Sequence, residues 1–192
     1  MAYFARVRYA CSFATDPGNA HMTISMHQAL VPPFVQMFDA LSGVLAKSAA
    51  FAAARKIDPS VLLQARLAPD MFPLLRQVQV ATDRAKGGIA RLAGIEVPSW
   101  PDTETTFPEL ETRVRKAVDY LQGFRPAQID GSEERVITFK SGGHELRFKG
   151  RDFLFGFVYP NLLFHVTTAY AVLRHNGVDV GKRDFLGNLP LA

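Results

Sequence analysis

The chain has 192 residues, a formal net charge of +4 and an apolar fraction of 48%, values that suit one domain with a substantial core. Its basic side chains are interspersed with acidic ones and form no basic stripe with interleaved aromatic residues, so we expect no nucleic-acid partner. Cys11 is the only cysteine, which excludes an intramolecular disulfide and a thiolate zinc site. This cysteine usage favours a cytoplasmic location.

Residues 1–21 precede the first periodic pattern and show none of their own. They contain Asp16-Pro17-Gly18-Asn19 and lack the continuous apolar core of a signal peptide, and Met22 directly after them resembles a second start. No apolar run approaches the roughly 18 residues of a membrane span. We therefore expect a leader over 1–21, disordered or a product of a misassigned start, a single domain over 22–192, and no membrane association.

Apolar residues recur at spacings of three and four from residue 24 to about residue 53, which predicts a long first helix. Pro32 and Pro33 fall inside this pattern and lack the amide hydrogen that a helix interior uses. We expect either a bend at these prolines or a helix that begins near Pro33. Asp58 followed by Pro59 then predicts a short connecting helix to about residue 64, because these residues favour the N-cap and the first turn.

A second long helix is predicted from Asp70, as its N-cap, to Gly94, where glycine ends the pattern. Gly87 and Gly88 each weaken this helix by about 1 kcal/mol relative to alanine. A protein tolerates that cost more readily where small residues let another helix approach closely.

Proline-rich residues 97–102 cannot continue a helix and are expected to form an ordered crossover anchored by Trp100. Thr106 and Glu109 have the spacing of a capping box, so a third helix is predicted from there to about residue 121.

Segments 135–140 and 144–149 alternate apolar and polar residues on either side of a glycine turn, which predicts a β-hairpin. Two isolated strands are marginal in water, so the hairpin must lie on the helices or pair with another chain. A fourth long helix follows over 152–175, with a bend at Pro160 and an end at Asn176-Gly177.

Four amphipathic helices bury their apolar stripes most simply as a bundle. We therefore predict a mainly all-α fold, a four-helix bundle with a small β-hairpin between the third and fourth bundle helices. The tail after residue 178 is expected to pack back through Phe185 and Leu186.

His165 is the strongest candidate for chemistry, because it shares the apolar stripe of the fourth helix with Val158, Leu162, Ala169 and Val172. A buried imidazole needs a hydrogen-bond partner, and its near-neutral intrinsic pKa suits proton transfer or one coordination bond. Two interpretations stay open: a core histidine satisfied by a neighbouring glutamine, threonine or tyrosine, or the polar wall of a pocket.

The other pocket-lining candidates are Asn161, Gln77, Gln79, His27 and Tyr170. Asn161 either satisfies the backbone below Pro160 or orients His165. Only one of the two glutamines can reach the pocket, because residues two apart do not share a helical face. His27 reaches the interior only if the proline bend turns it inward, and the Tyr170 hydroxyl competes with a simple packing role.

Four further side chains have weaker claims. Asp70 and Asp83 are second-helix carboxylates with a chance of facing the site, and Thr168 either offers a hydroxyl or bonds back to its own helix. His175 suits a helix C-terminus, where a cation meets the helix dipole. We expect no catalytic role for His144 in the hairpin or His21 in the leader, and no phosphate-binding loop, nucleophile elbow or Glu-x-x-His pair identifies an enzyme.

Three stretches carry a family resemblance: Leu67-Ala-Pro-Asp-Met-Phe-Pro-Leu74, Arg91-Leu-Ala-Gly94, and the run from His165 to Gly187. With these, the chain resembles the DinB-like (YfiT-type) metalloenzyme superfamily over about residues 22–187, most closely an uncharacterised domain-of-unknown-function branch. The resemblance implies a four-helix bundle, frequent homodimers, and a divalent metal, zinc or nickel, held by three histidines.

In the superfamily one metal-binding histidine comes from the second bundle helix and two, four positions apart, from the fourth. Aligning the helix end Leu173-Arg174-His175-Asn176-Gly177 places His165 at the second of these and Asn161 at the first. The second helix has no histidine, only Gln77 and Gln79, which are poor ligands for zinc. His165 is thus the metal ligand only if a metal is bound, and we expect no cofactor.

The leading interpretation is a cytoplasmic DinB-like protein with a degenerate metal site that binds a small molecule in an inter-helix pocket. One alternative is a metal- or thiol-dependent transferase or isomerase that uses His165. Another is a non-catalytic homodimeric scaffold, for which the edge of the hairpin offers a pairing surface.

Overall fold

The structure is a computed structural model that describes residues 23–191. Helix α1 (Met26–Arg55) begins before its two prolines and continues through them. Ser25 and Gln28 form a capping box, in which each side chain accepts a hydrogen bond from the other residue's backbone N–H. The expected start near Pro33 is therefore wrong, because this box fixes the first turn upstream of both prolines. The predicted leader over 1–21 lies outside the described residues.

The remaining elements follow in chain order: α2 (Pro59–Leu63), α3 (Leu74–Ala93), α4 (Phe107–Gln122), α5 (Pro126–Ile129), β1 (Val136–Ser141), β2 (His144–Lys149), α6 (Gly150–Phe153), the π-helical segment η1 (Leu154–Val158), α7 (Tyr159–His175) and α8 (Lys182–Leu186). The second bundle helix starts later than predicted, with Pro73 at its N-cap position and Asp70 exposed. A proline disfavours the helical conformation of the residue before it, so the prediction that Asp70 caps α3 is wrong.

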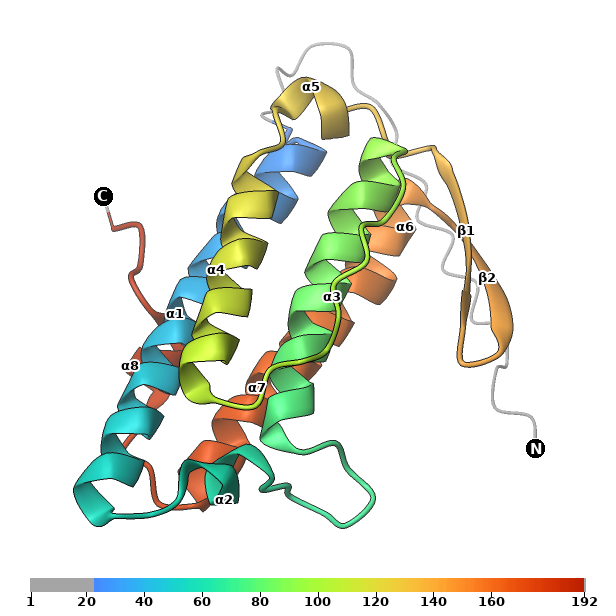
Figure 1. Cartoon of the computed structure of the whole chain (residues 1–192). Helices are drawn as coiled ribbons and strands as arrows, with labels where there is room; N and C mark the ends of the chain where they lie inside the picture. The colour runs from blue at the N-terminus through green and yellow to red at the C-terminus, as the bar shows by residue number, and fades with distance from the viewer. Residues whose placement is uncertain (1–22, 192) are drawn as a thin grey trace.

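The four long helices form a bundle in which α1 packs on α4, α4 on α3, α3 on α7, and α7 on α1. Helices α1 and α7 run in one direction and α3 and α4 in the other (Figure 1). Because α3 and α4 are parallel, residues 94–106 must travel back along the bundle between them. The predicted all-α fold, its crossover and its hairpin are confirmed.

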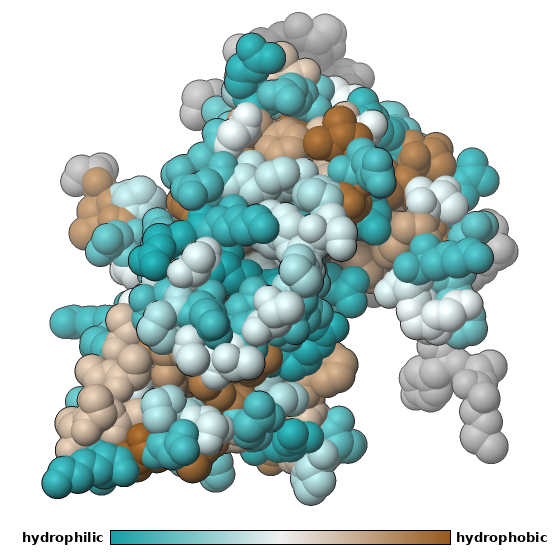
Figure 2. All heavy atoms as spheres, in the orientation of Figure 1, coloured by the Kyte–Doolittle hydropathy of each residue, from teal (hydrophilic) through white to brown (hydrophobic). Residues whose placement is uncertain are grey.

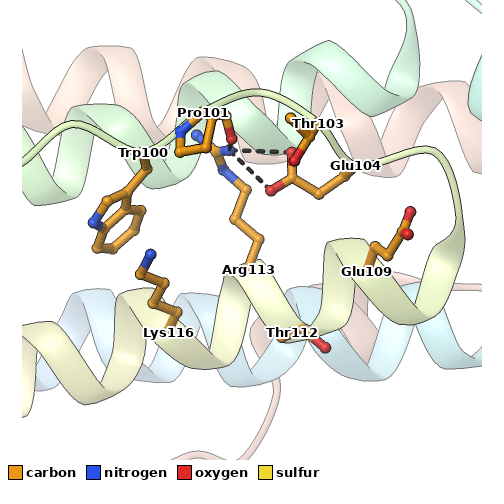
Figure 3. Close-up of a pocket in the computed structure, with 8 residues that line it drawn as sticks. All are labelled: Trp100, Pro101, Thr103, Glu104, Glu109, Thr112, Arg113 and Lys116. Atoms are coloured by element: carbon orange, nitrogen blue, oxygen red, sulfur yellow. Dashed lines mark hydrogen bonds and ion pairs between the residues drawn. The ribbon is translucent and has the colours of Figure 1, made fainter.

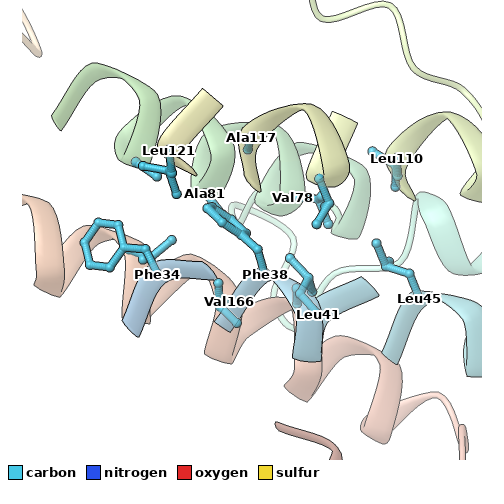
Figure 4. Packing of buried hydrophobic residues seen from close by; sticks show 14 of the residues in the cluster. Phe34, Phe38, Leu41, Leu45, Val78, Ala81, Leu110, Ala117, Leu121 and Val166 are labelled. Carbon is cyan, nitrogen blue, oxygen red and sulfur yellow. The ribbon is translucent and has the colours of Figure 1, made fainter. Parts of the chain in front are cut away.

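Apolar side chains from all four long helices meet along the bundle axis (Figure 4). The largest fully buried ones on α1 are Phe34 and Phe38, and Phe38 faces Ala81 of α3. Each fully buried large side chain contributes roughly 1.5–3 kcal/mol relative to exposure. The predicted stripes therefore supply the driving force that aligns the helices.

Pro33 leaves one α1 carbonyl without its helical partner, and α7 supplies a replacement. Proline has no N–H to donate to the carbonyl of Ala29, four residues earlier. The hydroxyl of Tyr159 donates to that carbonyl, and the Tyr159 ring packs edge-on against Phe34 with centroids 4.8 Å apart. Burial raises the pKa of the Tyr159 hydroxyl. The irregularity in α1 is thus a contact point with α7.

The hairpin lies against the bundle through its apolar face. Ile137 pairs with Phe148 and Phe139 with Leu146, across a two-residue turn in which Gly142 and Gly143 both have positive φ. The Phe139 ring packs edge-on against Phe153 and Phe157, with centroids 5.5 and 5.1 Å apart. Contact with the bundle is the first of the two arrangements expected for this hairpin.

The fourth bundle helix is continuous through α6, η1 and α7, and the irregularity expected at Pro160 is a π-helical turn just before it. The tail packs back as predicted, with the ring of Phe185 edge-on to Tyr170 at 5.7 Å. Helix α1 is the one described helix long and apolar enough to cross a membrane, and 44% of its most apolar stretch is buried in the bundle. Such burial is typical of a core helix.

The paired glycines of α3 predict unequal effects of alanine. A Cβ at Gly88 would lie 2.7 Å from Cγ1 of the buried Val158, whereas one at Gly87 would meet the flexible end of Arg91 at 2.5 Å. Both changes gain about 1 kcal/mol of helix propensity. We expect Gly88→Ala to be less stable than Gly87→Ala by about 1–3 kcal/mol in urea unfolding, because only Val158 cannot yield. Equal stabilities would contradict direct packing of Gly88 on Val158.

Candidate functional site

His165 of α7 faces α3, and the residue is 7% exposed. Its Nδ1 lies 2.7 Å from Oε1 of Gln77, and Nε2 of Gln77 donates to the carbonyl of Phe72 at 3.0 Å. The amide is oriented by the Phe72 carbonyl, so its oxygen faces the imidazole and Nδ1 must be the protonated nitrogen. Gln77 is therefore the partner that the sequence required for a buried histidine.

This tautomer leaves the lone pair of His165 on Nε2. That atom has no hydrogen-bond partner among residues 23–191, and it is not one of the fully buried side-chain atoms that lack a partner. It therefore keeps a small solvent exposure at the contact between α3 and α7 around Gln77 and His165, which we call the α3–α7 seam. Burial, together with the positive charges of Arg84 and Arg76, lowers the pKa of His165 to about 4. The ring is neutral at physiological pH.

Asn161 lies one turn before His165 on the same helix. Its Nδ2 donates to the carbonyl of Phe157 at 2.7 Å, so the amide satisfies the backbone of the π-helical turn. Of the two roles considered for Asn161, the structure shows the backbone role.

The α3–α7 seam is also basic. Arg84 and Arg91 lie seven residues apart on one face of α3, close to two helical turns, whereas Arg76, earlier on the same helix, pairs with Asp102 of the crossover. Each guanidinium lies over an aromatic ring, Arg84 at 5.6 Å from the centroid of Phe157 and Arg91 at 4.7 Å from that of Phe139. Burial lowers the pKa of both Arg84 and Arg91.

The donors around His165 do not fit a three-histidine metal site. The Gln77 oxygen accepts from the imidazole, and the Asn161 nitrogen donates to the backbone, so among the described residues Nε2 of His165 is the one histidine nitrogen that this seam offers. Among the described residues no three His, Cys, Asp or Glu side chains come together in an arrangement that could hold a metal ion.

The remaining candidates lie elsewhere. His27 Nε2 lies 2.9 Å from the carbonyl of Phe124, and Tyr170 packs on Phe185. Thr168 bonds back to the carbonyl of Phe164, and His144 and His175 are exposed. Of the two glutamines only Gln77 faces His165, as helical geometry required.

Gln79 belongs to a second polar cluster, between α3, α4 and the crossover, whose centre is Arg113 at 3% exposure. The Arg113 guanidinium donates to Thr82 at 2.8 Å and pairs with three carboxylates at 2.9–3.1 Å, those of Asp83, Asp102 and Glu104. Lys86 pairs with Asp83 at 2.7 Å, and Gln79 donates to Glu104 at 2.9 Å. Three helical or loop segments are thus tied together by one guanidinium.

A cavity of about 310 Å³ opens beside this cluster (Figure 3). Arg113 rises from α4 towards Pro101 and Glu104 of the crossover, and Lys116 lies under the ring of Trp100, its Nζ 4.6 Å from the centroid. Trp100 anchors the crossover as predicted. The surface over this region is mostly hydrophilic (Figure 2), and the charges of Arg113 and Glu104 satisfy each other. We therefore interpret the cluster as a structural network that holds the crossover against α3 and α4.

Sequence reasoning missed this cluster, although a signal was present. Gln79, Thr82, Asp83 and Lys86 recur at helical spacing beside the apolar stripe of α3, and Arg113 lies between Leu110 and Ala117 at the edge of the α4 stripe. Facing polar stripes on two neighbouring helices indicate a shared network.

Removal of Arg113 is expected to destabilise the protein. Arg113→Met leaves three carboxylates without their common cation, and we expect a loss of about 3 kcal/mol, the lower end of the range for broken buried pairs, because Asp83 and Asp102 are each about one-third exposed. Arg115→Met, at an exposed site on the same helix, is expected to change stability by less than about 0.5 kcal/mol. Urea unfolding gives the stability change of each variant, and equal changes would contradict a structural role for the Arg113 ion pairs.

The pKa of His165 predicts a pH dependence of stability. Its folded pKa of about 4 lies below the usual 6.5, so the unfolded chain binds the proton first and stability falls as pH drops from about 6.5 to about 4. The loss should reach about 3 kcal/mol relative to His165→Gln, which lacks this titration but shares all others. Unfolding free energies of the two proteins across this range provide the measurement, and parallel curves would contradict a buried neutral ring.

Comparison with known proteins gives a family but no activity. Residues 26–186 match the family described as "Domain of unknown function (DUF1993)". A DinB family member protein from Shewanella denitrificans, known from its crystal structure, is 42% identical, with a TM-score of 0.78, and the match covers 86% of this chain and 94% of that one. No curated protein matches the chain. The chain therefore belongs to the DUF1993 family and has a DinB-like fold.

Proposed function

We propose that this protein binds a small organic molecule at the α3–α7 seam, through the Nε2 of His165, and that the metal site of its superfamily has been lost. The observation that carries the proposal is the hydrogen-bond chain from the Phe72 carbonyl through Gln77 to Nδ1 of His165. This chain fixes the tautomer and the direction of the ring, so the free lone pair is oriented before any ligand arrives.

The low pKa of His165 favours binding over proton transfer. A general base works best when its pKa lies near the working pH, whereas an imidazole with a pKa of about 4 is a weak base at neutral pH. A neutral ring with an exposed lone pair still accepts a hydrogen bond from a hydroxyl, amide or amine. We therefore infer a ligand-binding role for His165.

Loss of the metal site is supported by the residues that stand at the other two ligand positions implied by the resemblance. Asn161 uses its amide nitrogen to complete the π-helical turn, and the second-helix position is taken by glutamine, whose oxygen is already bonded to His165. Neither amide is a good ligand for zinc. One imidazole nitrogen alone would hold a divalent ion weakly.

Metal content and ligand binding can be measured on the same untagged protein. Elemental analysis is expected to give substoichiometric zinc and nickel, and a mixture of small alcohols, amides and carboxylic acids is expected to shift the ring resonances of His165 in NMR spectra. The exposed His175 is the internal control and should not respond. Stoichiometric zinc or nickel that disappears in His165→Ala would overturn the proposal, as would a His165 ring that no compound affects.

Gln77 and Gln79 provide a matched pair of variants. Gln77→Leu removes the acceptor for Nδ1 of His165, so both tautomers become available and compounds that bind the seam should bind several-fold more weakly. Gln79→Leu removes an amide that faces Glu104 and should leave their binding unchanged. NMR titration with a compound from the mixture gives both affinities, and equal losses would show that Gln77 does not orient the site.

A further inference from the structure

The fourth bundle helix carries no charge on the side that faces solvent. Between Asp152 and Arg174 the sequence contains no Asp, Glu, Lys or Arg. The exposed residues of this stretch recur at helical spacing and form what we call the outer face of α7: Phe155, Gly156, Pro160, Leu163, Phe164 and Thr167. The exposed side of α4, by contrast, carries Arg115, Lys116 and Asp119. A helix that is uncharged all round is typical of one that is covered on every side.

Large apolar side chains make up much of this outer face. Phe155, Leu163 and Phe164 are 52%, 41% and 55% exposed. The Phe155 ring is held in place by stacking on Tyr159, with centroids 5.6 Å apart. A groove of about 380 Å³, lined in part by Phe155, Tyr159 and Ile24, extends the face towards the start of α1. Contiguous exposed apolar surface of this kind marks an interaction site.

The charges at the two ends of the outer face are arranged symmetrically about its middle. Asp152 and Arg174 are both exposed, and each lies eleven residues, or about three turns, from Leu163. When two such helices pack antiparallel about a twofold axis at Leu163, Asp152 of each copy meets Arg174 of the other, about 16 Å from the axis. A crossing angle of about 20° keeps the helices in contact over this length.

Both end charges are available for such a pair. The side chains of Asp152 and Arg174 are 58% and 57% exposed, and their ion pairs within the chain are long, 3.6 Å to Arg151 and 3.8 Å to Asp179. The outer face is therefore complementary in charge to a second copy of itself.

The same twofold arrangement matches large side chains with small ones. Phe155 and Ala171 lie eight residues on either side of Leu163, and Tyr159 and Thr167 lie four residues on either side. Each pair places an aromatic ring opposite a short side chain, as close packing between two helices requires.

We propose that the outer face of α7 binds a second copy of the chain in an antiparallel twofold dimer, with Leu163 at the axis and an ion pair between Asp152 and Arg174 at each end. The inference is independent of the proposed function. Leu163 and His165 are two residues apart and so lie on different sides of α7. The dimer contact therefore does not use the α3–α7 seam.

Analytical ultracentrifugation of the full chain over a range of concentrations tests the dimer. We expect a reversible dimer, and Leu163→Glu should raise its dissociation constant at least about hundredfold, because two like charges meet at the axis. Val61→Glu replaces an apolar side chain that is 57% exposed on α2, and it should leave the dissociation constant unchanged. Far-UV circular dichroism shows whether each variant is folded.

Charge exchange at the ends tests the antiparallel orientation. Asp152→Arg and Arg174→Asp each bring like charges together at both ends of the interface, so each should raise the dissociation constant about tenfold, roughly threefold for each of the two pairs. The double variant restores both pairs with reversed sign and should recover the original dissociation constant.

Three results would overturn the proposal. The first is a full chain that stays monomeric at every concentration, and the second is a dimer that Leu163→Glu leaves intact. The third is a double variant that dissociates as readily as the single ones. A monomer that binds phosphatidylcholine vesicles through Leu163 would assign the face to lipid, and one in which Leu163 cross-links to residues 1–22 would assign it to the leader.

Discussion

The close approach of α3 to the fourth bundle helix at Gly88 determines which side chains meet along the seam. Two antiparallel helices in contact at one fixed point have their register fixed along their whole length, because each residue advances the axis by about 1.5 Å. With Gly88 against Val158, Arg84 lies over Phe157 and Gln77 meets His165. A larger residue at position 88 would separate the helices and loosen every one of these contacts.

Helix α3 carries cationic side chains on two sides, and only those on one side have carboxylate partners among the described residues. Towards α4, Arg113 and Lys86 are buried against three carboxylates and the crossover is held in place. Towards α7, Arg84 and Arg91 are partly buried on phenylalanine rings and pair with no carboxylate within residues 23–191. The ion pairs on the α4 side are explained by their contribution to stability alone. The unsatisfied side costs stability, and uncompensated polar groups of that kind are typical of binding sites.

Periodic stripes predicted the helices, the crossover and the hairpin, because burial of apolar side chains dominates the choice of those elements. The capping box of α4 was predictable from two residues, whereas the start of α3 was not, since Pro73 overrides the cap expected at Asp70. The extent of α1 was predicted from its stripe, but the choice between a helix through Pro32 and Pro33 and a start near Pro33 could not be made, because a helix keeps internal prolines when a distant side chain such as Tyr159 satisfies the freed carbonyl. That compensation is tertiary and leaves no trace in local sequence.

For the candidate site, the spacing of the fourth helix predicted that His165 points inward, and the need for a partner predicted a neighbouring glutamine, threonine or tyrosine, of which the structure shows a glutamine. Gln77 could be separated from Gln79 only by the structure, because both fit the helical register. The sequence placed these arginines among basic residues interspersed with acidic ones, and nothing in the spacing of Arg84 and Arg91 shows that phenylalanines of η1 and the hairpin cover them. Their placement depends on contacts between segments far apart in the chain.

The proposed loss of metal agrees with the charge of Arg84. Its guanidinium lies over Phe157 and has no carboxylate beside it among residues 23–191, so it raises the positive potential along the seam and opposes a divalent cation near His165. The same potential helps to keep the imidazole neutral, since Arg84 is among the causes of its low pKa.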